Sequence, residues 1–312
     1  MLFVLPLVVV AMAFVSKLYP QQPVESVAVR GVINFPFLDQ MNEEWRPFVG
    51  FIIILGLAYM IFFISERFKL LAQTTTLPSF IYILLTSGIM VNLGFDTLLI
   101  SVFLVALAIE RLQMAINDLK SNRTLYDFGC LVMLAVAIYP KFILLLLWAF
   151  GVLFFSGRST LKDIMALWLG WITPVLFIAF YYFWNDQLEQ LPVIFTSNLL
   201  VGTFIHDLPT IELVRLGMLV FLLLVALYRL STKYSILIVS QRRGILSLVS
   251  LLIFLSLTFF VIPGNYYDFM YIFGLPLAFL YAYYFINSRM AIVSNLMFIF
   301  LLGACFLTYI IF

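Results

Sequence analysis

Long uncharged apolar runs alternate with short charged loops along the whole chain. A helix needs about 20 apolar residues to cross the hydrocarbon core of a membrane, and somewhat shorter runs are tolerated. Backbone polar groups in lipid must be paired within each segment, and no run alternates apolar and polar residues as the strands of a membrane barrel do. The pattern therefore predicts eleven membrane-spanning helices, at 1–18, 48–64, 77–92, 95–110, 125–138, 141–156, 163–184, 212–230, 245–262, 269–286 and 290–312.

Two pairs of these segments are separated by only a few residues. The pairs 77–92 with 95–110 and 125–138 with 141–156 fit tight hairpins that cross the membrane only in part, so we expect about nine to eleven spans. The stretches between spans are too short for a soluble domain, the longest being 19–47, 185–211 and 229–244. We therefore expect an all-α membrane protein in which residues 1–312 form one polytopic domain.

The loop charges indicate the orientation of the chain. With eleven spans and a cytoplasmic N-terminus, the cytoplasmic loops hold twelve of the 17 lysines and arginines, and the outside loops hold five. Cytoplasmic loops of membrane proteins carry an excess of these residues. The distribution predicts that the loop 19–47, the turn at 139–141, the stretch 185–211 and the turn at 263–268 lie outside.

Composition narrows the class of protein and its partners. Hydrophobic residues make up 65% of the chain and charged residues 10%, whereas roughly a quarter of a soluble domain is charged. We expect a multi-pass protein of the bacterial inner membrane whose partners are membrane lipids and other membrane proteins, and not nucleic acid. Cys130 and Cys305 lie far apart within apolar runs, which predicts buried, unreactive thiols and neither a disulfide nor a metal site. No cofactor motif is evident.

The first outside loop, 19–47, is long for a membrane connection. Its apolar segment from Val27 to Phe37 suits either the bilayer surface or an ordered cap, and we expect the loop to pack over the outside mouth of the bundle. The loop also places acids close to aromatic residues, where a carboxylate is a candidate general base. The catalytic candidates, in order of preference, are Asp39, Glu44 and Glu43.

Cations near the predicted outside surface are candidates for binding a lipid phosphate, which guanidinium groups bind with paired hydrogen bonds. Lys141 follows Pro140, and a proline breaks a helix because it lacks an N–H, so the lysine lies at a turn between two short spans. Glu212 and Arg215 begin a later span and fit one helix face, either as a structural pair or as part of a headgroup site. The phosphate-binding candidates are Lys141, Arg215, Arg46 and Arg30.

The remaining polar groups give weaker signals. His206 is the only histidine and is either a general acid or base or an ordinary loop residue. The cluster from Asn265 to Asp268 fits an interfacial turn, in which membrane anchoring accounts for both Tyr266 and Tyr267. The spans contain almost no ionisable residues, which argues against an ion-coupled transporter.

The region from Leu77 to Tyr182 carries a resemblance to known families. It contains Leu125-Tyr-Asp-Phe-Gly129 at the start of a span, Tyr139-Pro-Lys141 at its end, and Gly170-Trp-Ile-Thr-Pro174 in a later span. This order resembles an uncharacterised family of polytopic inner-membrane proteins of Bacteroidota, known as a domain of unknown function. It is also similar to the middle of the GT-C glycosyltransferases, which use polyprenyl-phosphate-linked sugars. The chain departs from that pattern because its first loop has no paired-acid signature and the usual periplasmic domain is missing.

The GT-C resemblance implies an enzyme that handles a polyprenyl-phosphate-linked sugar or lipid. Gly129, Lys141, Gly170 and Pro174 occupy comparable places, and a first-loop acid is expected to serve as the catalytic residue. In that case Lys141, Arg215 and Asp39 should converge on one cavity. Two other functions stay open from the sequence: a non-catalytic membrane subunit or scaffold of an envelope-assembly complex, and a transporter or lipid flippase.

Overall fold

The computed structural model describes residues 5–6, 31–33, 35, 45–71, 73–93, 96–118, 121–199, 210–264, 266–288 and 290–311. Within these residues all regular secondary structure is helical. The α-helices are α3 (Arg46–Arg67), α4 (Leu77–Leu93), α5 (Thr97–Asn117), α6 (Arg123–Ile138), α7 (Leu144–Ser156), α8 (Leu161–Trp184), α9 (Gln190–Leu199), α10 (Thr210–Lys233), α11 (Val239–Val261), α12 (Tyr266–Asn287) and α13 (Ala291–Ile311). Two short 3-10 helices, η1 (Pro140–Ile143) and η3 (Tyr234–Ile236), join α6 to α7 and α10 to α11.

The apolar segments predicted from 48–64 onwards coincide with helices of the structure. Helix α9 is additional, because the stretch 185–211 was predicted only as a connection. The predicted span 1–18 lies outside the described residues apart from positions 5–6. Among the described helices, six are long and apolar enough to cross a membrane, namely α3, α5, α8, α10 with η3, α11 and α12, and shorter apolar helices accompany them. The fold is that of a multi-pass helical membrane protein.

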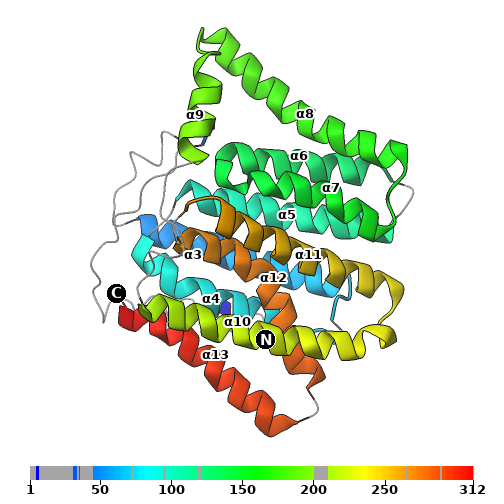
Figure 1. Ribbon diagram of the computed structural model, residues 1–312, viewed down its shortest axis with the longest axis vertical. Coiled ribbons are helices and arrows are strands. Elements are labelled where there is room, and N and C mark those ends of the chain that lie inside the picture. Colours follow the sequence, from blue (N-terminus) through cyan, green and yellow to red (C-terminus); the bar gives the residue numbers. More distant parts are fainter. Residues whose placement is uncertain are drawn as a thin grey trace.

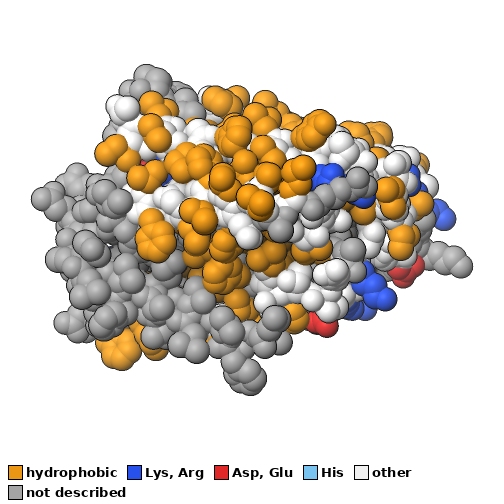
Figure 2. Space-filling view, turned by 90° about the horizontal axis from the view of Figure 1, so that it is seen from below, with side chains coloured by type: hydrophobic (Ala, Val, Ile, Leu, Met, Phe, Trp, Pro, Cys, Tyr) orange, Lys and Arg blue, Asp and Glu red, His pale blue; other side chains and the backbone are white. Residues whose placement is uncertain are grey.

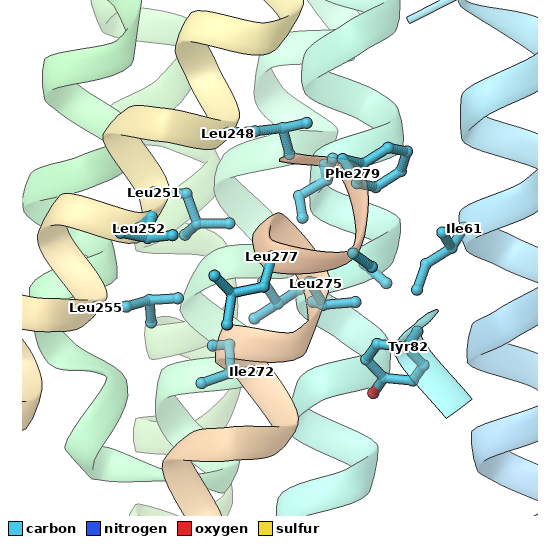
Figure 3. Close-up of a cluster of buried hydrophobic side chains, with 14 of the residues drawn as sticks. Ile61, Tyr82, Leu248, Leu251, Leu252, Leu255, Ile272, Leu275, Leu277 and Phe279 are labelled. Atoms are coloured by element: carbon cyan, nitrogen blue, oxygen red, sulfur yellow. The ribbon is translucent and has the colours of Figure 1, made fainter. Parts of the chain in front are cut away.

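Helix α12 lies at the centre of the bundle. It packs against α4, α5, α10 and α11, and in Figure 1 α8 and α13 lie at opposite edges of the stack of helices. A helix that is apolar on all sides is buried on all sides, and α12 has apolar residues around its whole circumference. Figure 3 shows its Ile272, Leu275 and Leu277 directed at leucines of α11 and at side chains of α3 and α4.

The helices of the first predicted hairpin have different main neighbours. Helix α4 packs chiefly against α3 and α12, whereas α5 packs chiefly against α6. In the second pair, η1 joins α6 to α7, and α6 makes its largest remaining contact with α8. Some consecutive helices, such as α3 with α4 and α5 with α6, pack directly on each other, whereas α4 and α5 have different main neighbours. The bundle is therefore not a simple row of sequential hairpins.

One end of the bundle collects most of the described lysines and arginines, and we call it the basic end. It is formed by the last turns of α3, α5, α7, α10 and α12 and the first turns of the helices that follow them. Contacts that join neighbouring helix ends there are Arg67–Glu110, Arg158–Asp118 and Arg229–Asn287. The described cations of this end are Arg67, Lys69, Arg111, Arg123, Arg158, Lys162, Arg229, Lys233, Arg242 and Arg243. Figure 2 shows Lys and Arg toward one end of an otherwise largely apolar face.

The opposite end holds the remaining described cations, Arg46, Lys141 and Arg215. It is formed by the first turns of α3, α5, α10 and α12 and by the turn between α6 and α7. Between the two ends the outer surface of the bundle is apolar, as on α8, where Trp168, Phe177 and Phe180 are exposed. An apolar belt bounded by polar ends is what a bilayer requires of a protein that spans it.

Candidate functional site

Lys141 lies in a break of the α6–α7 pair at the opposite end. The backbone of Tyr139 leaves the helical region, and Pro140 opens the 3-10 turn η1, so the predicted break at this proline is confirmed. Lys141 is nevertheless only 1% exposed. Its ammonium lies 5.9 Å from the centre of the Tyr139 ring, in a cation–π arrangement. The break thus turns a cation inward instead of leaving it at the membrane surface.

Asp268, in the first turn of α12, faces this lysine. The Tyr139 hydroxyl donates a 2.9 Å hydrogen bond to Oδ2 of Asp268, and the Asp268 carboxylate interacts electrostatically with Lys141, although these two side chains form no direct ion pair. A carboxylate in the first turn of a helix is also stabilised by the helix dipole. Asp268 is therefore held at the end of α12 by one hydroxyl, one nearby cation and its own helix.

Asp96 adds a second carboxylate to this group. It caps the N-terminus of α5, where its Oδ1 accepts a 2.6 Å hydrogen bond from the Thr97 N–H. Burial raises the pKa of Asp96 above its usual value, while the bonds from Thr97 and the charge of Arg46 act in the other direction. Asp96 also interacts electrostatically with Asp268. Arg46 and Lys141 thus each lie near a carboxylate of this group, Arg46 near the partly buried Asp96 and Lys141 near the buried Asp268.

Glu212 and Arg215 form a second polar cluster next to the first. The buried positions of α10 are Glu212, Arg215, Leu219, Leu222, Ala226 and Leu230, a single stripe that faces the bundle. The acid and the cation therefore occupy the first two core positions of the helix, which are 0% and 1% exposed. Their closest approach is 3.5 Å, between Nη1 of Arg215 and Oε2 of Glu212. The predicted shared face is confirmed, and it faces the core.

The guanidinium of Arg215 is incompletely satisfied. None of its three nitrogens makes a hydrogen bond within the described structure, and neither does Oε2 of Glu212. Oε1 of Glu212 accepts a 2.7 Å hydrogen bond from the Tyr267 hydroxyl. The guanidinium carbon also lies 5.9 Å from the centre of the Tyr266 ring. Because the ion pair uses Nη1, the edge formed by Nε and Nη2 remains available to another acceptor.

The two clusters meet at the start of α12. Two consecutive residues each contact one cluster: the Tyr267 hydroxyl donates to Glu212, and Asp268 accepts from the Tyr139 hydroxyl. The tyrosines are thus part of a buried polar site, and interfacial anchoring does not account for them. Sequence reasoning missed Asp96 and Asp268. The available signal was that α12 is apolar on all sides, because a charge in the first turn of a fully buried helix must also be buried.

An apolar groove leads from the Arg215 cluster along α10, α11 and α12. Its volume is about 120 Å³. Tyr266 lines the groove and also contacts Arg215, so the ring connects the groove to the guanidinium. The hydroxyl of Tyr266 is buried and makes no hydrogen bond within the described structure. The other walls are almost entirely apolar, with Leu223, Phe259 and Phe273 among them. The guanidinium of Arg215 therefore lies at one end of an apolar groove.

Five predicted site residues, Asp39, Glu43, Glu44, Arg30 and His206, lie outside the described residues, and so does most of the loop 19–47. The described part of that loop packs on the bundle: the N–H of Val32 donates to the carbonyl of Ala137, and the hydroxyl of Tyr182 donates to the carbonyl of Val32. Lys141 and Arg215 have different partners near the first turn of α12, and neither lines the cavities of the described structure. The convergence of Lys141, Arg215 and Asp39 on one cavity therefore stays a prediction.

The two cysteines differ in exposure. Cys305 is buried, and Cys130 is only partly buried, so the expectation of two buried thiols was wrong for Cys130. Neither forms a disulfide in the described structure. Among the described residues no three His, Cys, Asp or Glu side chains come together in a way that could hold a metal ion.

Comparison of the chain with protein-family models, with curated proteins and with solved structures gives no match.

Proposed function

We propose that this multi-pass membrane protein binds a lipid with an anionic, phosphate-type headgroup at the Arg215 cluster. The observation that carries the proposal is the guanidinium of Arg215, which is 1% exposed and makes no hydrogen bond to the described residues. A buried charge without hydrogen bonds is costly, so the site gains free energy from any ligand that supplies acceptors. A guanidinium edge with two adjacent donors matches the oxygens of a phosphate.

The surroundings of Arg215 support a lipid over a soluble anion. The groove between α10, α11 and α12 reaches Tyr266, whose ring contacts the guanidinium. Hydrocarbon chains gain free energy in such an apolar channel, at roughly 0.8 kcal/mol for each buried methylene group. Glu212 does not exclude an anion, because its Oε1 is bound by Tyr267 and its Oε2 faces the Nη1 side of the guanidinium. The headgroup takes the Nε–Nη2 edge.

The basic end supports an orientation for this site. Because cytoplasmic loops carry the excess of lysine and arginine, we place the basic end in the cytoplasm and the Arg215 cluster at the outer face of the bacterial inner membrane. With an N-terminal span before α3, this orientation puts the N-terminus in the cytoplasm and gives eleven spans. This orientation is tested with a cysteine introduced at position 236, at the basic end. In intact cells a membrane-impermeant thiol reagent should not label this cysteine, and labelling would contradict the proposed orientation.

The lipid class that the GT-C resemblance implies is a polyprenyl phosphate carrying a sugar. In this hypothesis Arg215 and Lys141 bind the phosphate and diphosphate oxygens, and Asp39, Glu44 or Glu43 acts as the base that activates an acceptor hydroxyl. A headgroup site without a base suits a non-catalytic subunit of an envelope-assembly complex equally well. Conversion of a polyprenyl-phosphate sugar by the purified protein, and its loss in Asp39→Asn, distinguishes the enzyme from the subunit.

The binding proposal is tested by lipid-dependent thermal stability. Protein in nanodiscs of phosphatidylcholine is compared with protein in nanodiscs that also contain phosphatidylglycerol or undecaprenyl phosphate. The anionic lipids should raise the unfolding temperature, because a ligand that binds only the folded state stabilises it. The increase should disappear in Arg215→Met.

Two controls make this result specific. Arg111→Met removes an exposed cation from the basic end and should keep the full increase. The double variant Glu212→Gln with Arg215→Met leaves no unpaired buried charge and provides a folded protein that should also show no increase. An equal increase in the wild type and in the double variant would overturn the proposal.

A further inference from the structure

Helices α6 and α8 cross closely at one point and then separate. Their contact is built on Gly129 and Gly170: a Cβ on Gly129 would lie 2.7 Å from the carbonyl oxygen of Leu167, and a Cβ on Gly170 would clash with the carbonyl of Tyr126. Glycine permits this approach because it has no side chain. Both residues lie in the half of their helix nearer the basic end, and Figure 1 shows α8 diverging from α6 toward α9.

The separation leaves a cavity of about 750 Å³ between the two helices, within the usual range for ligand sites of roughly 300–1,000 Å³. Phe177 and Ile178 of α8 face Leu134 of α6 across it. Val32 and Ile33 of the first loop form a further wall, which Tyr182 holds in place through its bond to the Val32 carbonyl. The walls of the cavity therefore come from three separate chain segments, namely α6, α8 and the first loop.

The lining of this cavity is uncharged. It contains Cys130, Thr173, Tyr181, Tyr182 and Gln187, and the other described lining residues are apolar. The hydroxyl of Tyr181 and the side-chain amide of Gln187 make no hydrogen bond to another described residue, and both residues are exposed near the opposite end. Thr173 and Cys130 lie deeper, toward the glycine crossing. The two neutral groups without a described hydrogen bond thus lie toward the opposite end of a largely apolar space.

We propose that this cavity binds a neutral lipid whose headgroup carries hydroxyl groups. A phosphate is disfavoured because no described lining residue is a cation, and an anion moved out of water without a partner is costly. A water-soluble ligand is disfavoured because α8 exposes apolar side chains such as Phe180 and Leu176 on its remaining surface, so the cavity borders the bilayer. Hydroxyl groups of the ligand both donate to and accept from Gln187 and Tyr181, and the lipid chain lies beside Phe177.

This site is chemically distinct from the Arg215 cluster and does not depend on it. Both lie toward the same end of the bundle but on different helices: the cavity lies between α6 and α8, whereas the Arg215 cluster is formed by α10 and the first turn of α12.

Cys130 provides a direct reporter for occupancy. The chain has two cysteines, so Cys305→Ala leaves Cys130 as the only thiol. This variant is placed in phosphatidylcholine nanodiscs, and the rate of Cys130 alkylation by N-ethylmaleimide is measured. Adding monoglucosyl diacylglycerol should slow alkylation several-fold, whereas the same amount of phosphatidylglycerol with the same chains should leave the rate unchanged.

Two further variants keep the test decisive. Gln187→Leu should abolish the slowing, read as the ratio of the alkylation rates with and without glycolipid in the same variant, because it removes a headgroup contact at the exposed end. Arg215→Met combined with Glu212→Gln should keep the slowing in full, so that failure at the anionic site does not affect this result. No slowing by the glycolipid, or equal slowing by both lipids, would overturn the proposal.

Discussion

Each end of the bundle contains a fully buried arginine, and the two arginines differ in their hydrogen-bond partners. Arg158 at the basic end and Arg215 at the opposite end are both 1% exposed. Arg158 is paired with Asp163 at 3.3 Å and donates to the backbone carbonyls of Asp118 and Ser121. Arg215 has one ion pair at 3.5 Å and makes no hydrogen bond within the described structure. Burial alone therefore does not distinguish the two arginines: only Nε of Arg158 lacks a hydrogen bond in the described structure, whereas all three nitrogens of Arg215 lack one.

The partners of the two arginines explain the difference. Asp163 is itself fixed by a capping box with Thr160 at the start of α8, and the carbonyls come from the connection between α5 and α6. Arg158 thus joins three chain segments and is part of the framework. Arg215 is surrounded by Glu212 and by the rings at the start of α12, which satisfy the carboxylate more completely than the cation.

The largest expected effect is the loss of Arg158. Arg158→Met leaves Asp163 without its cation and two carbonyls without their donor, and removing one partner of a buried pair costs roughly 3–5 kcal/mol. The free energy of unfolding, measured in detergent by thermal or denaturant titration, should fall by that amount. Arg123→Met, an exposed arginine of the same end, serves as the control and should change it by less than about 0.5 kcal/mol. If Arg158→Met changes the free energy of unfolding no more than Arg123→Met does, Arg158 is not a framework residue and the proposed difference between Arg158 and Arg215 is wrong.

The second prediction concerns the Glu212–Arg215 pair. Arg215→Met alone leaves a buried carboxylate and should cost roughly 3 kcal/mol in the absence of anionic lipid, whereas the double variant with Glu212→Gln should recover most of this loss, because replacing a whole buried ion pair is often neutral. A double-mutant cycle on the free energy of unfolding measures the recovery. If the double variant is as unstable as the single one, Arg215 is a framework residue like Arg158.

The third prediction extends the contrast to the α6–α8 pair, which is closed toward the basic end and open toward the other. Gly170→Ala forces a methyl group against the Tyr126 carbonyl and should destabilise the protein by about 1–3 kcal/mol, as overpacking does. Gly217 on α10 has open space where a Cβ would be, so Gly217→Ala is the matched control and should gain up to about 1 kcal/mol from helix propensity. Equal tolerance at both positions would contradict the close crossing.

The smallest expected effect is a change in pH dependence from Asp96. Its pKa is raised in the folded protein, so the unfolded chain loses this proton at lower pH than the folded protein does. Stability should therefore fall as the pH rises from about 4, the usual pKa of aspartate, through the raised value. Asp96→Asn keeps a cap acceptor for Thr97 and should raise the unfolding temperature near neutral pH, with a difference that shrinks toward acid pH.

The sequence by itself determined the helices, the break at Pro140, the shared face of Glu212 and Arg215, and the sorting of basic loops to one end. These features follow from local rules: apolar length, the missing N–H of proline, helical spacing and alternation of loop charge. Each depends on residues close together in the chain, and the structure places them where the pattern predicts.

Only the tertiary structure decided which polar groups meet. Tyr139 and Asp268 are 129 positions apart, and Tyr267 and Glu212 are 55 apart, and no local pattern selects such partners. The helix α9 and the cavity between α6 and α8 were also absent from the pattern. The physical reason is that a helix is set by its own residues, whereas the packing of α12 at the centre depends on the shapes of all the helices around it. That packing buries both Lys141 and Arg215 near the first turn of α12 and leaves the guanidinium of Arg215 without a hydrogen bond in the described structure.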